Sequence, residues 1–409
     1  MVNDLHDVAI VGAGPGGAAA AHYLARQGLD VLLLDKADFP RDKTCGDGLT
    51  PRALAVLGDM GILSDLRRVG RRIRGLEIFS PNGRSVTARI PEMAGMPDDL
   101  LVVPRMILDN TVLERALASG AKLAGGIPVG AVEQRADRVV VTGEHAGGTV
   151  SFQARMAIIA TGASIKLLIR MGILREMPPM MVAARTYFEG MSELSDRIQL
   201  RFDGVPLPGY GWVFPLSEGS ANVGAGVYAG RTARRRTAIS ARQAFDAFVH
   251  SPSLERMLAS AHQVGPVKGY PLRVDFATAP TFGERALLVG EAAGLVNPLS
   301  GEGVDYALES GKIAAEHLAW MFSTGDLSRK NLEAYDRRLR QHFQSLFLFC
   351  NRVRDLCLNR ICLNFLVGAA GRRADLKTAL IRVVLGDQEL ARHMSLGRIL
   401  KAVLAAPVI

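Results

Sequence analysis

The sequence predicts an α/β protein built from a strand–helix–strand domain, an α+β domain and a helical C-terminal region. A length of 409 residues is too great for one ordinary domain and fits two or three. Buried strand-like runs followed by helical runs occur near both ends of the first 325 residues, with alternating strand patterns between them. Hydrophobic residues at 48% and charged residues at 22% are values of a globular protein with a substantial core.

Several classes of protein are excluded by composition. No uncharged apolar run approaches the roughly 20 residues needed to span a bilayer, so we expect no transmembrane helix. The chain runs from Met1 directly into a strand-like segment without a basic and then apolar leader, so we expect a cytoplasmic protein. No disulfide framework or metal site is indicated by the spacing of the four cysteines, Cys45, Cys350, Cys357 and Cys362.

The N-terminal segment predicts a dinucleotide-binding unit. An apolar strand at residues 7–12 leads into the glycine-rich run Gly12-Ala-Gly14-Pro-Gly-Gly17. A helical run over residues 18–27 and a second buried strand over residues 31–35 follow. The glycine motif alone is weak, but strand, glycines, helix, strand and terminal acid together form the fingerprint in its required context. The competing interpretation is a purely structural strand–turn–helix.

Each position of this motif has a physical role in binding a dinucleotide. Gly12 makes the tight turn, Gly14 lets the backbone approach a pyrophosphate, and Gly17 lets the helix pack closely on the strand. The helix N-terminus attracts the pyrophosphate charge. Asp35 can accept hydrogen bonds from a ribose diol, and Lys36 follows it in the sequence. An adenine dinucleotide is therefore expected here.

A second strand–loop–helix lies far downstream. Residues 285–290 form a buried strand ending in Gly290-Glu291, and a loop Asn297-Pro298-Leu-Ser-Gly301-Glu302-Gly303 leads into a helical run over residues 304–321. This segment resembles the flavoprotein superfamily typified by p-hydroxybenzoate hydroxylase, which implies that the cofactor is FAD. The resemblance implies that Glu291 binds the ribityl hydroxyls. Amides near Gly301 and Gly303 would face the pyrimidine edge of the flavin. Family members more often have Gly-Asp where this chain has Gly-Glu.

Two further blocks narrow the resemblance. They are Pro40-Arg-Asp-Lys-Thr-Cys45-Gly46-Asp47-Gly48-Leu-Thr-Pro51-Arg52 and Pro208-Gly-Tyr210-Gly-Trp212-Val-Phe214-Pro215. With the downstream loop, they are similar to the geranylgeranyl reductase family, including its menaquinone side-chain reductases. The resemblance implies that reduced FAD saturates double bonds of an isoprenoid chain. Substrates in this family range from geranylgeranyl diphosphate and tetrapyrroles to ether lipids and polyprenyl quinones.

The candidate substrate and catalytic residues lie in these blocks. Aromatic residues at every second position of a strand share one face, so Tyr210, Trp212 and Phe214 predict an apolar wall for a prenyl chain, or alternatively a plain sheet core. Cys45 and Asp47 are the candidate catalytic residues: a thiol there can gate the substrate or supply a proton, and Asp47 can do so instead or simply bond the turn backbone. The full set of expected cofactor contacts is Gly12, Gly14, Gly17, Asp35, Lys36, Cys45, Gly46, Arg105, Gly290, Glu291, Pro298, Gly301 and Gly303.

One departure from the superfamily bears on the electron donor. Hydroxylases usually carry an Asp-Gly pair after a buried strand, whereas the matching stretch here is Ala160-Thr161-Gly162-Ala163-Ser164. NADPH therefore remains only one candidate, as a transient donor, beside a ferredoxin or a deazaflavin. The alternative function is a flavin-dependent monooxygenase on an apolar or aromatic small molecule. The halogenase version lacks its lysine, because no lysine occurs between Lys43 and Lys122. A lipid-binding protein with an inactive flavin is the third hypothesis.

Segment order predicts a discontinuous FAD-binding domain (residues 1–75, 100–165 and 275–325), a substrate domain (76–99 and 166–274) and a helical region (326–409). Residues 336–409 contain 11 Arg and 2 Lys against 4 Asp and 1 Glu, so they carry +8 of the net charge of +9. Because apolar stretches interleave with these charges, we expect peripheral contact with an anionic membrane rather than with nucleic acid. A solvated basic helix face is the alternative. No feature predicts the oligomeric state.

Overall fold

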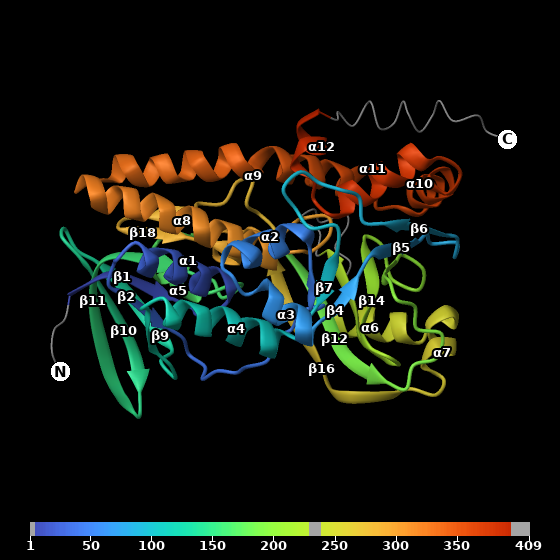
Figure 1. Ribbon diagram of the computed structural model, residues 1–409, viewed down its shortest axis with the longest axis horizontal. Coiled ribbons are helices and arrows are strands. Elements are labelled where there is room, and N and C mark those ends of the chain that lie inside the picture. Colours follow the sequence, from blue (N-terminus) through green and yellow to red (C-terminus); the bar gives the residue numbers. More distant parts are fainter. Residues whose placement is uncertain (1–4, 229–238, 394–409) are drawn as a thin grey trace.

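Two large β-sheets lie side by side, and long C-terminal helices extend across both (Figure 1). The computed structural model describes residues 5–228 and 239–393. The basic residues Arg398 and Lys401, part of the predicted membrane-contacting region, lie outside the described residues.

The first sheet is formed by the predicted strand–helix–strand unit and the downstream strand. Its central strands are parallel, with Val8 of β1 paired to Val31 of β2 and to Met156 of β11. The apolar runs read from the sequence are buried here on both faces, as expected for a parallel sheet covered by helices. Its strands are β1 (Leu5–Val11), β2 (Val31–Leu34), β8 (Lys122–Ala124), β9 (Val129–Gln134), β10 (Val139–His145), β11 (Gly148–Ile159), β17 (Phe282–Gly283) and β18 (Ala286–Leu288).

Helices α1 (Pro15–Arg26) and α8 (Val304–Thr324) pack closely against each other beside this sheet. Their approach depends on Gly311, because a Cβ there would lie 2.3 Å from the carbonyl oxygen of Gly16. The helix α4 (Arg105–Ala118) packs on α1 from another side. Shorter helical elements near these are α2 (Pro51–Asp59), α3 (Leu63–Val69), α5 (Lys166–Arg170) and η1 (Gly290–Ala293).

The second sheet contains the aromatic strand. β14 (Gly209–Ser217) is central, paired antiparallel with β15 (Ser220–Tyr228) and β13 (Ile198–Arg201). The other strands are β5 (Gly75–Phe79), β6 (Ser85–Arg89), β12 (Met180–Glu189) and β16 (His262–Arg273), and helices α6 (Ala241–Val249) and α7 (Pro252–Leu258) belong to the same part of the molecule. A small third sheet of β3 (Gly48–Leu49), β7 (Leu100–Val102) and β4 (Arg71–Ile73) contains the end of the Cys45 loop.

The C-terminal helices are divided between the two cores. α9 (Arg329–Cys357) packs beside β17 and β18, and Tyr335 donates a hydrogen bond of 2.8 Å to the carbonyl oxygen of Leu288. α10 (Arg360–Arg372) and α11 (Ala374–Val384) instead pack beside β6 of the second sheet, and α12 (Gln388–His393) returns to α9 (Figure 1). The helical region therefore spans both sheets, and the domain boundaries expected from the sequence remain a prediction.

Candidate active site

A single elongated cavity of about 680 Å³ joins the glycine motif of the first sheet to the aromatic strand of the second. At one end it is lined by Gly12, Gly14 and Asp35, and at the other by Phe214 and by Leu385 just beyond α11. A dinucleotide site and an apolar chamber are thus continuous.

The three glycines of the N-terminal motif have different steric surroundings. A Cβ on Gly17 would lie 1.8 Å from the carbonyl oxygen of Gly12, and one on Gly12 would lie 2.3 Å from that of Ala160. A Cβ on Gly14 would meet only the Arg41 side chain, at 3.5 Å. Packing within the protein therefore requires Gly12 and Gly17, whereas Gly14 keeps part of the cavity open.

Asp35 joins the glycine loop to the next turn. Its carboxylate accepts hydrogen bonds from the backbone amides of Ala13, at 2.8 Å, and Ala37, at 2.9 Å. The side chain is largely buried but lines the cavity, so remaining lone pairs can face a ligand. Lys36, also predicted as a cofactor contact, is exposed and lines the same end of the cavity.

The Cys45 loop passes between the two sheets. Cys45, Gly46 and Gly48 line the cavity, and a Cβ on either glycine would lie 2.9 Å from the ring of Phe214. These glycines therefore let the loop lie against the aromatic strand. Burial raises the pKa of the Cys45 thiol, while the nearby Arg105 guanidinium acts in the opposite direction. The thiol is accordingly protonated at neutral pH.

Asp47 holds this loop in an unusual backbone conformation. Its φ is +67°, in the left-handed region that Asx residues tolerate better than most. The carboxylate accepts hydrogen bonds of 2.8 Å from both Asn222 and Tyr187, which lie on neighbouring strands of the second sheet. Burial raises its pKa to about 6, although these two donors lower it. The structure places Asp47 beside the cavity and not on its lining, unlike Cys45.

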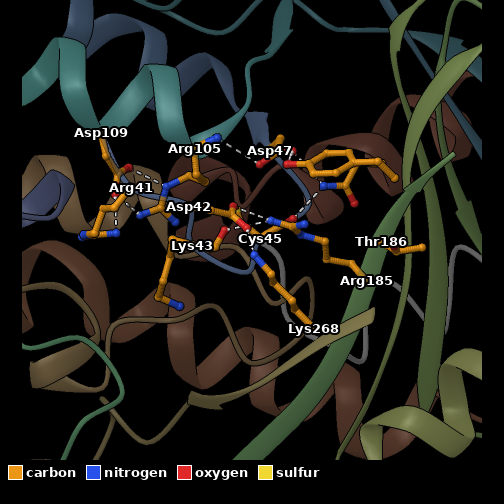
Figure 2. Close-up of polar contacts among 12 residues, drawn as sticks. Arg41, Asp42, Lys43, Cys45, Asp47, Arg105, Asp109, Arg185, Thr186 and Lys268 are labelled. Atoms are coloured by element: carbon orange, nitrogen blue, oxygen red, sulfur yellow. Dashed lines mark hydrogen bonds and ion pairs between the residues drawn. The ribbon is translucent and has the colours of Figure 1, made fainter. Parts of the chain in front are cut away.

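Arg105 begins α4 and faces the cavity. Its guanidinium makes a bidentate contact with Asp109, at 2.6 and 2.8 Å, and Arg41 reaches the same carboxylate at 3.1 Å (Figure 2). Asp109 is fully buried, so two arginines neutralise it. This pair explains how a cation is stabilised at the first position of a helix, where the dipole disfavours it.

The sequence reasoning missed a group of charged residues that surrounds the loop. The ammonium of Lys43 lies 3.1 Å from the ring centroid of Tyr270, and both line the cavity. Burial lowers the pKa of Lys43 to about 8, and the Glu291 carboxylate counteracts this shift. Asp42 binds Arg185, at 2.7 Å, and Lys268, at 2.5 Å, from the second sheet (Figure 2). Only the adjacency of Asp42 and Lys43 to Cys45 was visible in the sequence.

The downstream segment lines the cavity with Glu291 and two glycines. Glu291 lines the cavity as expected, and its carboxylate accepts a hydrogen bond of 2.9 Å from the backbone amide of Arg273. Gly301 and Gly303 also line the cavity, but their amides are already bonded, to the carbonyl oxygen of Asn297 and to the Glu302 carboxylate. That amides near Gly301 and Gly303 face a flavin edge stays a prediction; in this structure both glycine amides are bonded within the protein.

Two further predicted cofactor residues differ in their position relative to the cavity. Gly290 lines the cavity with a φ of +56°, and a Cβ there would lie 3.0 Å from that of Ala307. Pro298 is buried and does not line the cavity, and its contact with the cofactor stays a prediction.

The aromatic strand forms a wall of the apolar chamber. Tyr210, Trp212 and Phe214 all line the cavity, with successive ring centroids 6.1 and 6.3 Å apart. The Trp212 indole donates a 2.9 Å hydrogen bond to Asn222, the same side chain that binds Asp47. The wall and the Cys45 loop are therefore held by one asparagine.

The residues present fit FAD. The α1 N-terminus has no side-chain cap and lies at the cavity, beside the space that Gly14 leaves open. The carboxylates of Asp35 and Glu291 lie along the same cavity as acceptors for hydroxyl groups. An uncapped helix N-terminus and two acceptors are the groups that a pyrophosphate, a ribose and a ribityl chain require.

Comparison with known proteins agrees with this geometry. The model of a family described as FAD binding domain matches residues 6–349. A menaquinone reductase of Mycobacterium tuberculosis is 37% identical over 338 residues, covering 80% of this chain and 79% of that protein. A digeranylgeranylglycerophospholipid reductase of Methanosphaera stadtmanae is 30% identical over 366 residues, and the match covers 86% of this chain and 88% of that protein.

A solved structure shares the whole fold. A geranylgeranyl bacteriochlorophyll reductase-like protein of Thermoplasma acidophilum superimposes with a TM-score of 0.80 at 23% identity, covering 98% of this chain and 96% of that one. At this identity the likeness shows that the arrangement of the two sheets and C-terminal helices is common to both chains.

Proposed function

This chain belongs to the FAD binding domain family and is a geranylgeranyl reductase-like FAD-dependent reductase, and we propose that its substrate is the isoprenoid chain of a quinone or lipid. The observation that carries this proposal is the continuity of the cavity from the dinucleotide site to the aromatic wall. A long apolar chain can therefore lie beside the redox group. The alternative, a monooxygenase, is not favoured by the relatives above.

The residues of the chain hold the substrate in place and exclude water from the reaction. When bound and reduced, FAD supplies a hydride. An isolated alkene is a poor hydride acceptor, so the protein must hold it in place, exclude water and provide a proton. Tyr210, Trp212 and Phe214 offer ring faces to methyl-branched units, and Leu385 helps to close the chamber. The uncapped α1 N-terminus would stabilise the negative charge of a bound pyrophosphate, and Lys36 would add a positive charge at the same end of the cavity.

We also propose that the corner between α9 and α10 touches an anionic membrane surface. Three apolar side chains project there with high exposure: Leu356 at 55%, Ile361 at 84% and Phe365 at 37%. The exposed Arg352 and Arg360 lie beside them in the sequence. Apolar and basic side chains together are typical of interfacial helices. Within the described residues, no helix has the length and apolar character needed to cross a bilayer.

The experiment that tests the proposed function is an anaerobic single turnover. Enzyme reduced with dithionite is mixed with menaquinone, a geranylgeranylated lipid and geranylgeranyl diphosphate in turn, and products are analysed by mass spectrometry. Reduction adds one pair of hydrogen atoms per double bond and reoxidises the flavin. Flavin that stays reduced with every prenyl substrate, or oxygen insertion after air is admitted, would contradict the assignment. Reduction of the flavin by NADPH in the same apparatus tests the electron donor.

A further inference from the structure

A partly buried carboxyl group just before α8 faces the cavity without a role in the functions described above. Glu302 lines the cavity in the same region as Cys45 and Tyr210. Its Oε1 accepts hydrogen bonds of 3.1 Å from the backbone amides of both Gly303 and Val304. Its Oε2 has no hydrogen bond to any residue that the structure describes. One oxygen therefore anchors the side chain, and the other is available to a bound molecule.

The charges around Glu302 come from every element that packs against it. The titratable groups that act on Glu302 are Asp305 on α8, Arg105 on α4, Cys45 on the loop and Tyr210 on β14, while Arg52 on α2 acts on Asp305. Burial, and after it the neighbouring Asp305 carboxylate, raise the pKa of Glu302 to about 8, against the opposing effects of the two amides and of Arg105. The carboxyl group is thus mainly protonated at neutral pH.

Asp305 itself is fixed by residues at the start of α2. Thr50 donates a 3.1 Å hydrogen bond to its carboxylate, and the Arg52 guanidinium lies 3.8 Å from the same oxygen. Arg52 is in turn held by Glu309, at 2.9 Å, and by the carbonyl oxygen of Gly386, at 3.0 Å. Asp305 therefore stays in place near Glu302 and contributes a negative charge there.

Neither residue first considered as an acid has these properties. The Asp47 carboxylate is bonded to Asn222 and Tyr187 and lies off the cavity lining. Cys45 lines the cavity, but burial raises its thiol pKa from an already high value, which makes it a weak acid. Glu302 combines a position on the cavity with a free oxygen atom.

We propose that Glu302 is the catalytic acid that protonates the substrate alkene through its free carboxyl oxygen, and that Asp305 acts through Glu302 as a positioning residue. This inference rests on the proposed function. The π bond of the alkene breaks, one carbon gains the hydride that reduced FAD supplies, and the other gains the proton of the Glu302 carboxyl group. The O–H bond of Glu302 breaks and its carboxylate remains; after the product leaves the cavity, a proton from solvent restores the carboxyl group before the next turnover.

The test compares Glu302→Gln, Asp305→Asn and Glu316→Gln, the last being an exposed carboxylate of α8 away from the cavity. Glu302→Gln keeps an acceptor for the two amides but has no acidic proton, so the rate of alkene reduction should fall about 100-fold or more with FAD still bound. In the wild type the rate should fall as pH rises through about 8, because deprotonated Glu302 cannot donate. Asp305→Asn should move this fall to lower pH, and Glu316→Gln should leave it unchanged.

A second readout does not depend on turnover. Infrared spectroscopy of the FAD-free protein should show a protonated-carboxyl band at pH 7 that disappears in Glu302→Gln and titrates near pH 8 in the wild type. If Glu302→Gln does not fold, Glu302→Asp should retain the alkaline fall in rate at reduced activity. Full activity with an unchanged pH profile in Glu302→Gln, or no such band, would overturn the inference. Failure of the wild type to reduce any prenyl substrate would overturn the proposed function, while the infrared titration still decides the state of Glu302.

Discussion

Substitution of Gly14 and of Gly17 by alanine should separate ligand binding from folding within one motif. Gly14 has φ −69° and ψ −177°, an extended conformation that alanine adopts readily, and the added methyl group would meet only Arg41 at 3.5 Å. At Gly17 the methyl group would lie 1.8 Å from the carbonyl oxygen of Gly12, a separation no real Cβ contact shows.

The magnitudes follow from these contacts. For Gly14→Ala, the loss of a good N-cap residue destabilises the protein by roughly 0.5–1 kcal/mol. Alanine also lowers the conformational entropy of the unfolded chain, which stabilises the folded protein by about the same amount. The free energy of unfolding of the FAD-free protein should therefore change by less than about 1 kcal/mol. Gly17→Ala must push α1 away from β1, so its cost should be about 3 kcal/mol. FAD affinity of Gly14→Ala should fall at least tenfold, which is about 1.4 kcal/mol, because the methyl group enters the space for the pyrophosphate.

Urea denaturation of the FAD-free variants, followed by circular dichroism, measures the first pair of values. Quenching of FAD fluorescence on titration measures the affinity. Equal destabilisation by the two substitutions would show that Gly14 is needed for packing, and unchanged FAD affinity in Gly14→Ala would show that the pyrophosphate does not bind beside it. Either result would refute this account of the cavity.

Three other predictions concern the wall, the loop and the surface. Trp212→Ala should raise KM for a prenyl substrate while FAD stays bound, as judged by steady-state kinetics and flavin absorbance; unchanged kinetics would return Trp212 to a purely structural role. Because the Asp47 pKa is raised to about 6, the folded protein holds a proton that the unfolded chain has released, so the free energy of unfolding should fall as pH rises from about 4 to 6. Asp47→Asn should flatten this part of the profile in urea titrations, and an unaltered slope would contradict the raised pKa. Ile361→Ser should weaken co-sedimentation with anionic liposomes at low salt more than the control Val264→Ser, which changes an exposed apolar site on β16. Salt at 1 M shortens the Debye length to about 3 Å and should release the protein. Equal binding to neutral liposomes, or binding that 1 M salt does not weaken, would refute electrostatic docking.

The fold was predictable where local patterns and tertiary structure agree. The strand, glycine run and helix near residues 7–27 appear as β1 and α1, and the downstream helix expected at residues 304–321 appears as Val304–Thr324. In both segments the hydrophobic periodicity and the residues that mark the ends of helices and strands are visible in the local sequence. The distribution of the C-terminal helices was not predictable, because α9 and α10 are both amphipathic and their composition does not say which sheet each one covers.

The site was predictable in its backbone and less so in its polar contacts. The wall of Tyr210, Trp212 and Phe214 follows from the period of a strand, and the three rings do share one face. The contact between Asn222 and Asp47 joins residues 175 positions apart, and no local pattern in the chain indicates it. Lys43 and Tyr270 meet across an even longer stretch of sequence. Such pairs are set by how the two sheets are placed, which one sequence does not reveal.

Glu302 shows why residue identity alone did not identify the acid. In the sequence it lies between two glycines before a helix, where a carboxylate is expected to bind helix amides and to be ionised. The structure confirms the contact with the amides, which by itself would lower the pKa. Burial and the adjacent Asp305 act in the opposite direction and outweigh it, so the pKa is raised to about 8. Asp47 is a candidate catalytic residue in the Cys-Gly-Asp-Gly motif, but its carboxylate already accepts hydrogen bonds from two side chains. Whether a buried carboxyl group can give up a proton to a substrate therefore depends on an oxygen left free at the cavity, and this separates Glu302 from Asp47.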